Sequence, residues 1–235
     1  MNNDSNLWIL SIDPGTVNFC FYIEEINIKE LKNIQNIPKE KRYLPNGICT
    51  SEFGEILKKV YLNGKKILLK NINITESANK NKYFDIEFCH NITDILDQYS
   101  LYFDKVSYII IEMQMSFKNK YNTKALKIAQ HCESYFIFKY SRFKTIIEFP
   151  AYYKTQTLGC KKIKNIKNGK TTYKNIEKPE RKKWCIEKGT EILKEREDFI
   201  TLYDIMSNSK KDDKMDTICQ IQAFKYLYFV DNKKF

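Results

Sequence analysis

The sequence predicts an α/β fold in which a mixed β-sheet is flanked by helices on both faces. Two strand-like runs on either side of a tight turn open the chain, and a later run, Val106–Ile111, is almost wholly β-branched and apolar. Helical patterns alternate with the later strand-like runs, an order that is typical of α/β proteins. The 235 residues are 43% hydrophobic, which is enough for the core of one domain.

The N-terminal runs predict a β-hairpin followed by a third strand. Leu7–Ile12 is an apolar strand, Asp13–Gly15 is a turn with Pro and Gly, and Asn18–Glu24 resumes the apolar pattern. Residues 27–64 are rich in turn formers, so we expect a loop or a small insertion there. Lys66–Thr75 alternates weakly and is interpreted as the third strand.

The middle of the chain alternates between helical and strand patterns. Phe84–Phe103 and Thr123–Tyr140 carry apolar residues at helical spacing. Val106–Ile111, which lies between them, has the composition of a strand buried on both faces. Lys144–Phe149 predicts a further short buried strand.

The C-terminal third predicts a polar loop and then two helices. Residues 159–178 are basic and contain Asn and Gly, so we expect a flexible loop. Pro179 suits the first turn of a helix that runs to about Leu193, and Asp213–Phe229 is amphipathic. We interpret the whole chain as one domain, 1–235, with insertions around 27–80 and 160–178.

The chain is strongly basic, and most of its net charge of +11 falls between Arg142 and Lys183. Tyr152, Tyr153, Tyr173 and Trp184 are interleaved with or adjoin these basic residues. Cationic side chains can contact phosphates and aromatic rings can stack on bases, so this segment predicts a nucleic-acid surface. The alternative is a solvated loop in a chain that is rich in Lys and Asn throughout.

Several other classes of protein are disfavoured by the sequence. No run approaches 18 apolar residues and no signal or transit pattern opens the chain, so we expect an intracellular protein without a membrane partner. The seven cysteines form no C-x-x-C pair, which argues against a zinc site and a disulfide framework. The Asp13-Pro-Gly turn also occurs in actin-like phosphotransferases, but a chain with seven glycines lacks their Gly-rich phosphate loops.

Four acidic residues occur where a metal-dependent nuclease would need them. Asp13 and Glu112 each end a strand-like run, and Asp213 and Asp216 lie three residues apart in a helical one. Carboxylate oxygens bind hard divalent cations, and two such ions can activate water and stabilise a leaving phosphate oxygen. Each acid also has an ordinary alternative: a turn at Asp13, a solvent-facing strand end at Glu112, and a helix cap by Asp212 or Asp213 with a solvated second acid.

Three motifs in this order carry a more specific resemblance. Ser11–Thr16 followed by Asn18 resembles a first catalytic motif, Ile111–Gln114 resembles an I-E-x-Q motif, and Lys211–Asp216 resembles a closing K-D-D-x-x-D motif. These are the motifs of the RuvC-like Holliday junction resolvases of the RNase H superfamily. The chain is most similar to their poxviral and fungal mitochondrial branch.

Two basic stretches extend the resemblance. Pro150–Gly159, which contains Lys154, resembles a P-x-x-x-K-x-x-x-x-G stretch that follows a strand in bacterial members. Arg181–Trp184 resembles the basic start of the next helix, where the family keeps an active-site lysine. Either Lys182 or Lys183 can fill that place, and the sequence alone leaves the choice open.

The resemblance implies an RNase H-like fold and a homodimeric Mg²⁺-dependent endonuclease, active also with Mn²⁺, that cuts four-way DNA junctions by paired symmetric nicks. The implied metal ligands are Asp13, Glu112, Asp213 and Asp216, and the implied catalytic lysines are Lys154, Lys182 and Lys183. We expect DNA contacts from Lys154, Lys161, Lys162, Lys164, Lys167, Arg181 and the candidate aromatic wedge Phe117. The implied location is the cytoplasm, in a viral factory if the protein is viral, or the mitochondrion if it is fungal-like.

Two other functions stay open at this point. Another RNase H-like nuclease, of the transposase type or specific for flaps and other branched DNA, would use the same carboxylates on a different substrate. A non-catalytic DNA-binding module on the same fold is disfavoured, because a pure binder gains little from four acids beside DNA phosphates.

Overall fold

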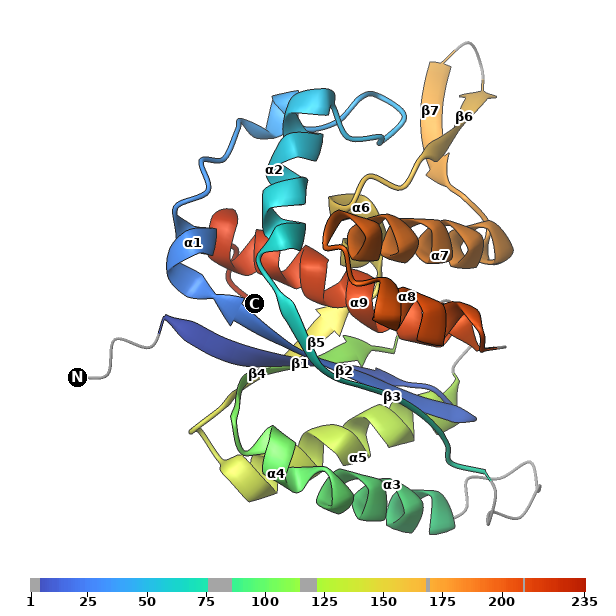
Figure 1. The fold of residues 1–235 in the computed structure, drawn as a ribbon. Coiled ribbons are helices and arrows are strands. Elements are labelled where there is room, and N and C mark those ends of the chain that lie inside the picture. The colour runs from blue at the N-terminus through green and yellow to red at the C-terminus, as the bar shows by residue number, and fades with distance from the viewer. Residues whose placement is uncertain (1–4, 76–85, 115–121, 168–169, 209) are drawn as a thin grey trace. The chain divides into compact units, whose positions relative to one another are not determined.

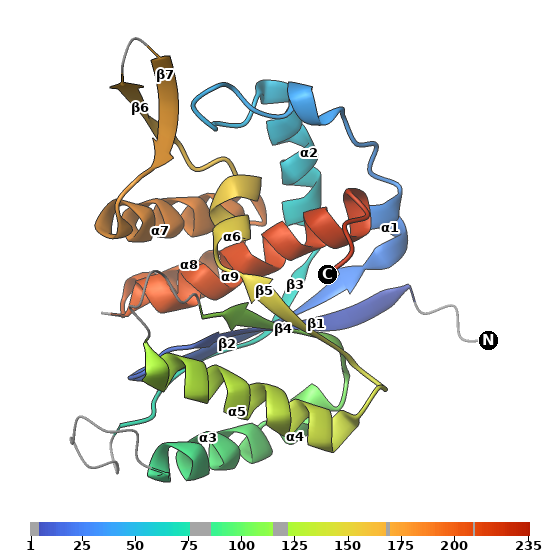
Figure 2. The ribbon, with the colours of Figure 1, turned by 180° about the vertical axis from the view of Figure 1, so that it is seen from behind.

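The computed structural model describes residues 5–75, 86–114, 122–167, 170–208 and 210–235. The chain divides into two compact units, and Figures 1 and 2 follow it through both. The first, here called the sheet unit, contains Met1–Ile26, Lys65–Ala151 and Phe235. The second, here called the helical unit, contains Asn27–Gly64 and Tyr152–Lys234.

A five-stranded mixed sheet forms the sheet unit, with the strand order β3-β2-β1-β4-β5. Strand β2 pairs antiparallel with β3, whereas β4 pairs parallel with both β1 and β5. This is the predicted RNase H-like arrangement, so the fold class is confirmed. The strands are β1 (Asn6–Pro14), β2 (Asn18–Asn27), β3 (Lys65–Asn73), β4 (Val106–Met113) and β5 (Thr145–Pro150).

A tight turn joins β1 to β2 and confirms the predicted hairpin. The Gly15 N–H donates to the carbonyl of Asp13 over 2.9 Å, immediately after β1. A Cβ atom at Gly15 would collide with the carbonyl oxygen of Asn18, so only glycine fits this turn. The short connection forces the two strands to run antiparallel and holds Asp13 at the end of β1.

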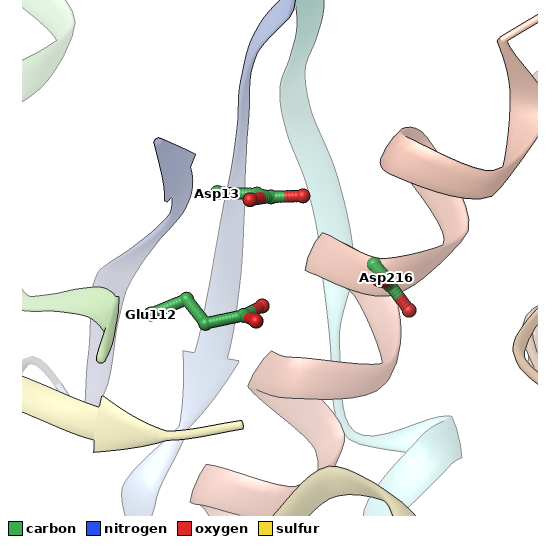
Figure 3. A group of neighbouring side chains, drawn as sticks. All are labelled: Asp13, Glu112 and Asp216. Carbon is green, nitrogen blue, oxygen red and sulfur yellow. The ribbon is translucent and has the colours of Figure 1, made fainter. Parts of the chain in front are cut away.

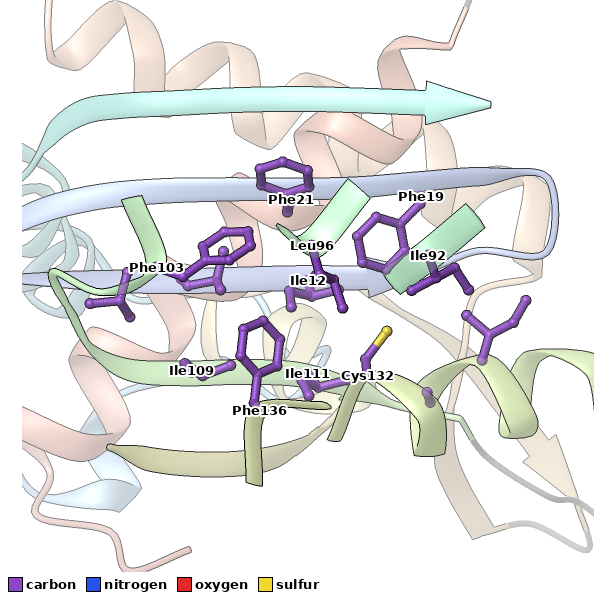
Figure 4. Packing of buried hydrophobic residues seen from close by; sticks show 14 of the residues in the cluster. Ile12, Phe19, Phe21, Ile92, Leu96, Phe103, Ile109, Ile111, Cys132 and Phe136 are labelled. Carbon is purple, nitrogen blue, oxygen red and sulfur yellow. The ribbon is translucent and has the colours of Figure 1, made fainter. Parts of the chain in front are cut away.

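Three helices cover one face of the sheet: α3 (Glu87–Gln98), α4 (Ser100–Phe103) and α5 (Thr123–Tyr140). Figures 1 and 2 both show them together on that side. Their apolar side chains form one core with residues from β1, β2 and β4, and Figure 4 shows Phe21, Phe103 and Phe136 meeting there. The ring centroid of Phe103 lies 5.6 Å from that of Phe21 and 5.5 Å from that of Phe136, and both pairs have edge-to-face geometry.

The observed helices differ from the predicted ones in one place within this unit. The single helix predicted over Phe84–Phe103 begins outside the described residues, and its described part is two helices, because Tyr99 leaves helical geometry between α3 and α4. Helix α5 has the predicted bounds, Thr123–Tyr140. Its N-terminus is capped by Asn122, whose side chain accepts from the Ala125 N–H.

The helical unit is built around the contact between α7 (Lys178–Glu195) and α9 (Lys211–Lys225). The two helices come so close that a Cβ at Gly189 would stand 2.5 Å from the sulfur of Met215. The helical unit also contains further elements. They are α1 (Ile28–Lys32), α2 (Ser51–Leu62), α6 (Tyr152–Thr157), α8 (Phe199–Met206), the 3₁₀ turn η1 (Lys39–Lys41) and the π-helical turn η2 (Tyr226–Val230). The sequence does not predict α6, α8 or the closing π-helical turn as separate elements.

The segment 27–64 is an ordered part of the helical unit, and the predicted loop is wrong over α2, which is a helix. Thr50 caps α2 by accepting from the Phe53 N–H over 3.3 Å. Arg42 and Asp231 form a largely buried ion pair of 2.7 Å, and the Lys225 ammonium donates to the Asn63 carbonyl over 2.6 Å. These contacts join the segment to the C-terminal helix.

The basic segment forms a second, two-stranded sheet where a flexible loop over 159–178 is predicted. Strands β6 (Lys162–Lys167) and β7 (Lys170–Asn175) pair antiparallel, with Lys164 opposite Tyr173. Figures 1 and 2 show this hairpin, hereafter the basic hairpin, projecting beyond α6 and α7. No helix among the described residues is both long and apolar enough to cross a bilayer.

Candidate functional site

Asp13 and Glu112 lie side by side at the carboxyl ends of two parallel strands. The register pairs Ile12 of β1 with Ile111 of β4, so the next residues along both strands are the two acids. Because side chains alternate across a strand and Ile12 and Ile111 face the helix-covered core, both acids point away from that core. One carboxylate oxygen of Asp13 lies within 4.8 Å of one of Glu112.

The pair is half-buried, and Figure 3 shows both carboxylates extending in the same direction from β1 and β4. Two ionised carboxylates at this separation repel each other, and a cation between them relieves the repulsion. The side-chain amide of Gln114 donates to the carbonyl of Glu112 over 3.4 Å. The glutamine of the I-E-x-Q motif therefore contacts the backbone at the end of β4.

Asp213 and Asp216 lie one turn apart on α9, as the sequence predicts. The ammonium of Lys154, on α6, lies 3.1 Å from a carboxylate oxygen of Asp216. The side chain of Lys154 is only 6% exposed, whereas that of Asp216 is 24% exposed. The structure thus brings one predicted lysine and one predicted acid into direct contact within the helical unit.

Lys182 and Lys183 lie next to each other on α7 but have different surroundings. The Lys182 ammonium donates a short hydrogen bond to Asp212, at the start of α9, and this bond raises the pKa of Lys182. The nearby charges of Asp213 and Asp216 raise the pKa further. Lys183 is 81% exposed and lies 3.9 Å from Glu187 on its own helix.

Asp212 faces Lys182 and does not cap α9, which begins after Lys210 without a side-chain cap. Burial alone would raise the pKa of Asp212, but the hydrogen bond and charge of Lys182 outweigh it and lower the pKa. The predicted alternative of capping by Asp212 is therefore wrong. Of the two lysines that the sequence leaves open, Lys182 is the one that faces the acidic start of α9.

The predicted DNA-contacting residues fall in three places. Lys161 and Lys162 lie at the base of the basic hairpin, Lys164 is exposed on β6, and Arg181 is exposed in the first turns of α7. Lys167 ends β6, and only its backbone is described. Phe117 lies outside the described residues.

The basic hairpin is the main feature of this surface that the sequence-based interpretation missed. Every residue of β7 is exposed, and Ile166 on β6 is 66% exposed, so no apolar face marks either strand. The dipeptide Asn168-Gly169 is a strong hairpin signal in the sequence and could have predicted that the flanking segments pair. Neither strand alternates between buried apolar and exposed polar residues, so the pattern that normally predicts strands is missing from both.

Comparison with known proteins assigns the chain to a family of viral proteins. It is 32% identical over 238 residues to "Uncharacterized protein 170L" of Invertebrate iridescent virus 6, covering 97% of this chain and 92% of that protein. The chain belongs to the family of 170L. It is also 26% identical over 224 residues to "Uncharacterized protein 97L" of Invertebrate iridescent virus 3, covering 92% of this chain and 98% of that protein.

No protein-family model matches the chain. Among solved structures it is similar to Thermus thermophilus RuvC in complex with a Holliday junction substrate, with a TM-score of 0.49 and 8% identity over 95% of this chain and 97% of that one. A structure of T. thermophilus RuvC matches with a TM-score of 0.47 and 10% identity over 94% of this chain and 95% of that one. Because these scores are low, the fold class rests on the strand order and pairing of the sheet.

Proposed function

We propose that this member of the 170L family is a divalent-metal-dependent endonuclease that cuts branched DNA, with four-way junctions as its substrate. The observation that carries the proposal is the pair of carboxylates, Asp13 and Glu112, at the adjacent ends of parallel strands in an RNase H-like sheet. A DNA-binding module without catalytic activity has no physical need for two half-buried acids at this place, since each repels DNA phosphates.

Asp216 is the proposed third ligand, and Asp213, one turn earlier on α9, would complete the acidic set. The proposal requires one oxygen each from Asp13, Glu112 and Asp216 to lie within 4.8 Å of one another, so that all three can reach a shared ion. A donor set made only of carboxylate oxygens fits Mg²⁺, or Mn²⁺ in its place, and does not favour zinc, which takes sulfur and nitrogen ligands. When bound, such an ion supplies Lewis-acid activation of water and stabilises charge on the leaving oxygen.

The lysines of the helical unit would act on the phosphate. Lys154 is held beside Asp216, and in the proposed reaction its ammonium would stabilise the negative charge that grows as a phosphodiester is hydrolysed. Lys182 occupies the position next to the acidic start of α9 and is the proposed counterpart of the active-site lysine of resolvases. Its raised pKa keeps it protonated at neutral pH, which suits electrostatic stabilisation and excludes a role as general base.

The basic hairpin and Arg181 would bind the DNA backbone. Lys164, Lys170 and Lys174 project from exposed strands, and Tyr173 lies among them with its ring partly in solvent. Two symmetric cuts across a junction need two active sites, so we also propose a homodimer with two-fold symmetry. The oligomeric state is measurable by sedimentation equilibrium with and without junction DNA.

The deciding experiment is cleavage of a synthetic four-way junction beside a flap and a linear duplex, with Mg²⁺ and with EDTA. We expect Mg²⁺-dependent paired nicks in the junction, and a loss of at least about a hundredfold in rate for Asp13→Asn or Glu112→Gln with retained gel-shift binding. Asp94→Asn, an exposed acid on α3, is the matched control and should cut normally. Normal cleavage by Asp13→Asn would refute the proposed metal site.

The same substrate panel separates the alternatives. Preferential cutting of the flap would indicate another RNase H-like nuclease with the same carboxylates. Tight junction binding without cleavage under any metal would favour a non-catalytic binding module.

A further inference from the structure

A pocket of about 340 Å³ lies in the helical unit at the base of the basic hairpin. Its walls come from the loop that contains Tyr43 and Gly47, from helix α6, and from the residues that enter and leave the hairpin. Its size is at the small end of the range for ligand sites in proteins, which suits a single compact molecule.

The pocket walls are held by specific contacts. The Lys162 N–H donates to the carbonyl of Asn46 over 2.7 Å, and the Tyr43 hydroxyl donates to the carbonyl of Thr157 over 3.1 Å. Gly47 adopts a φ of +84°, and a Cβ there would stand 3.2 Å from the carbonyl oxygen of Cys160. Glycine at position 47 therefore suits both the positive φ and the close approach of the loop to the base of the hairpin.

The chemistry of the lining is that of a nucleotide site. Lys161, Lys162 and Arg181 supply positive charge, and none of the described residues that line the pocket is Asp or Glu. Tyr43 and Tyr153 offer aromatic rings, and Gln156 offers an amide that can donate and accept hydrogen bonds. Sites for unstacked nucleotides combine an aromatic or apolar surface for the base, polar groups for its edge and cations for the phosphate.

Within the helical unit, helix α6 contacts both this pocket and Asp216, the proposed third metal ligand. Tyr153 and Thr155 line the pocket, whereas Lys154, between them in the sequence, lies 3.1 Å from Asp216. A nucleotide in the pocket would thus be held by the same short helix that places Lys154. We propose that the pocket takes one unpaired nucleotide of the DNA strand next to the scissile phosphate, and this inference rests on the proposed nuclease function.

A direct binding experiment tests the pocket without any cleavage. Calorimetric titration of the full chain in EDTA with each of the four deoxynucleoside 5′-monophosphates, and with inorganic phosphate alone, measures which chemistry is recognised. We expect at least one mononucleotide to bind at least fivefold more tightly than inorganic phosphate. The double variant Lys161→Gln, Arg181→Gln should weaken it at least fivefold, because both exposed cations line the pocket.

The matched control is Lys194→Gln, which removes an exposed charge from the same helix as Arg181 but outside the pocket lining. It should leave mononucleotide binding unchanged. An equal loss in Lys194→Gln, or mononucleotides that bind no better than inorganic phosphate, would overturn the inference in favour of general charge attraction.

A second experiment places the nucleotide in the substrate. A four-way junction carrying 2-aminopurine at successive positions near the branch should brighten on binding at one position, because this base fluoresces when it is unstacked. Normal junction binding and cleavage with no brightening at any position would reject the pocket and leave the proposed function intact. Failure to bind or cut junctions would reject the proposed function, and mononucleotide titration would still decide the pocket.

Discussion

The contact between Lys154 and Asp216 gives a quantitative test of how the helical unit is held together. Lys154→Met keeps most of the side-chain length but removes the ammonium 3.1 Å from the Asp216 carboxylate. Removing one partner of a fully buried ion pair typically costs about 3–5 kcal/mol, because the other charge stays buried. Asp216 is 24% exposed, so water partly hydrates its orphaned charge, and we expect the free energy of unfolding to fall by about 1–2 kcal/mol.

The assay is urea unfolding in EDTA, followed by circular dichroism, for the wild type, both single variants and the double variant Lys154→Met, Asp216→Asn. We expect a coupling free energy of about 1 kcal/mol between the two sites, since the double variant leaves no unpaired charge. Lys214→Met is the matched control, because its ammonium also lies 3.1 Å from a carboxylate oxygen, that of Asp204, which is 61% exposed. It should cost less than about 1 kcal/mol.

Mg²⁺ provides a second check on the same pair. If Asp216 is a metal ligand, Mg²⁺ should restore part of the stability that Lys154→Met loses, because binding to the folded state stabilises it by mass action. The reasoning is refuted if Lys154→Met costs no more than Lys214→Met, or if the effects of the two substitutions at Lys154 and Asp216 are additive.

Three further perturbations have defined outcomes. Gly189→Ala should lower the free energy of unfolding by about 1–3 kcal/mol, because the new Cβ would approach the Met215 sulfur to 2.5 Å. Thermal denaturation measures the loss of stability, and an unchanged Tm would contradict the packing of α7 on α9. Burial raises the pKa of Glu133 from its ordinary 4.5 to about 7, and the hydrogen bond with Glu148 and the charge of Glu148 contribute to this rise. Between these two pH values the folded state therefore keeps a proton that the unfolded state has lost. Stability should therefore fall as pH rises from about 4.5 to 7, by about 1 kcal/mol because Glu133 is partly exposed, and Glu133→Gln should flatten this dependence in pH-dependent urea melts. The last variant neutralises four lysines in and next to the basic hairpin: Lys161, Lys162, Lys164 and Lys167. It should weaken binding to many DNAs alike and reduce the slope of log affinity against log salt by about 0.9 for each phosphate that the variant no longer neutralises. An unchanged slope would leave the hairpin without a role in DNA binding.

The sequence by itself determined the elements whose apolar residues repeat at a regular period. The apolar runs of β1 and β4 and the helical pattern of Thr123–Tyr140 predict those elements with nearly their observed bounds. Local patterns suffice there because burial against one core selects the side chains of a whole strand or helix face. The pairing of β1 with β4 is decided by the tertiary structure, and its parallel register places Asp13 beside Glu112 at one edge of the sheet.

Segments without such a pattern are predicted poorly. The strands of the basic hairpin are exposed and carry Lys, Asn and Thr, so no buried face distinguishes them from a loop. Helix α2 has apolar residues at helical spacing, but Gly54 within it and the turn formers around it obscure the signal. The hairpin depends on backbone pairing between its own two exposed strands, whereas α2 depends on packing against α7 and α9, which are distant in the chain.

Only the tertiary structure decided which lysine contacts which acid. Lys154 pairs with Asp216 and Lys182 pairs with Asp212, while Lys183, next to Lys182 in the chain, points to solvent. These choices follow from the way α6 and α7 pack against α9, and neighbouring residues on a helix face directions about 100° apart. A sequence pattern can place several lysines near an acidic motif, but the rotation of each helix against its neighbour selects the side chain that reaches the acid.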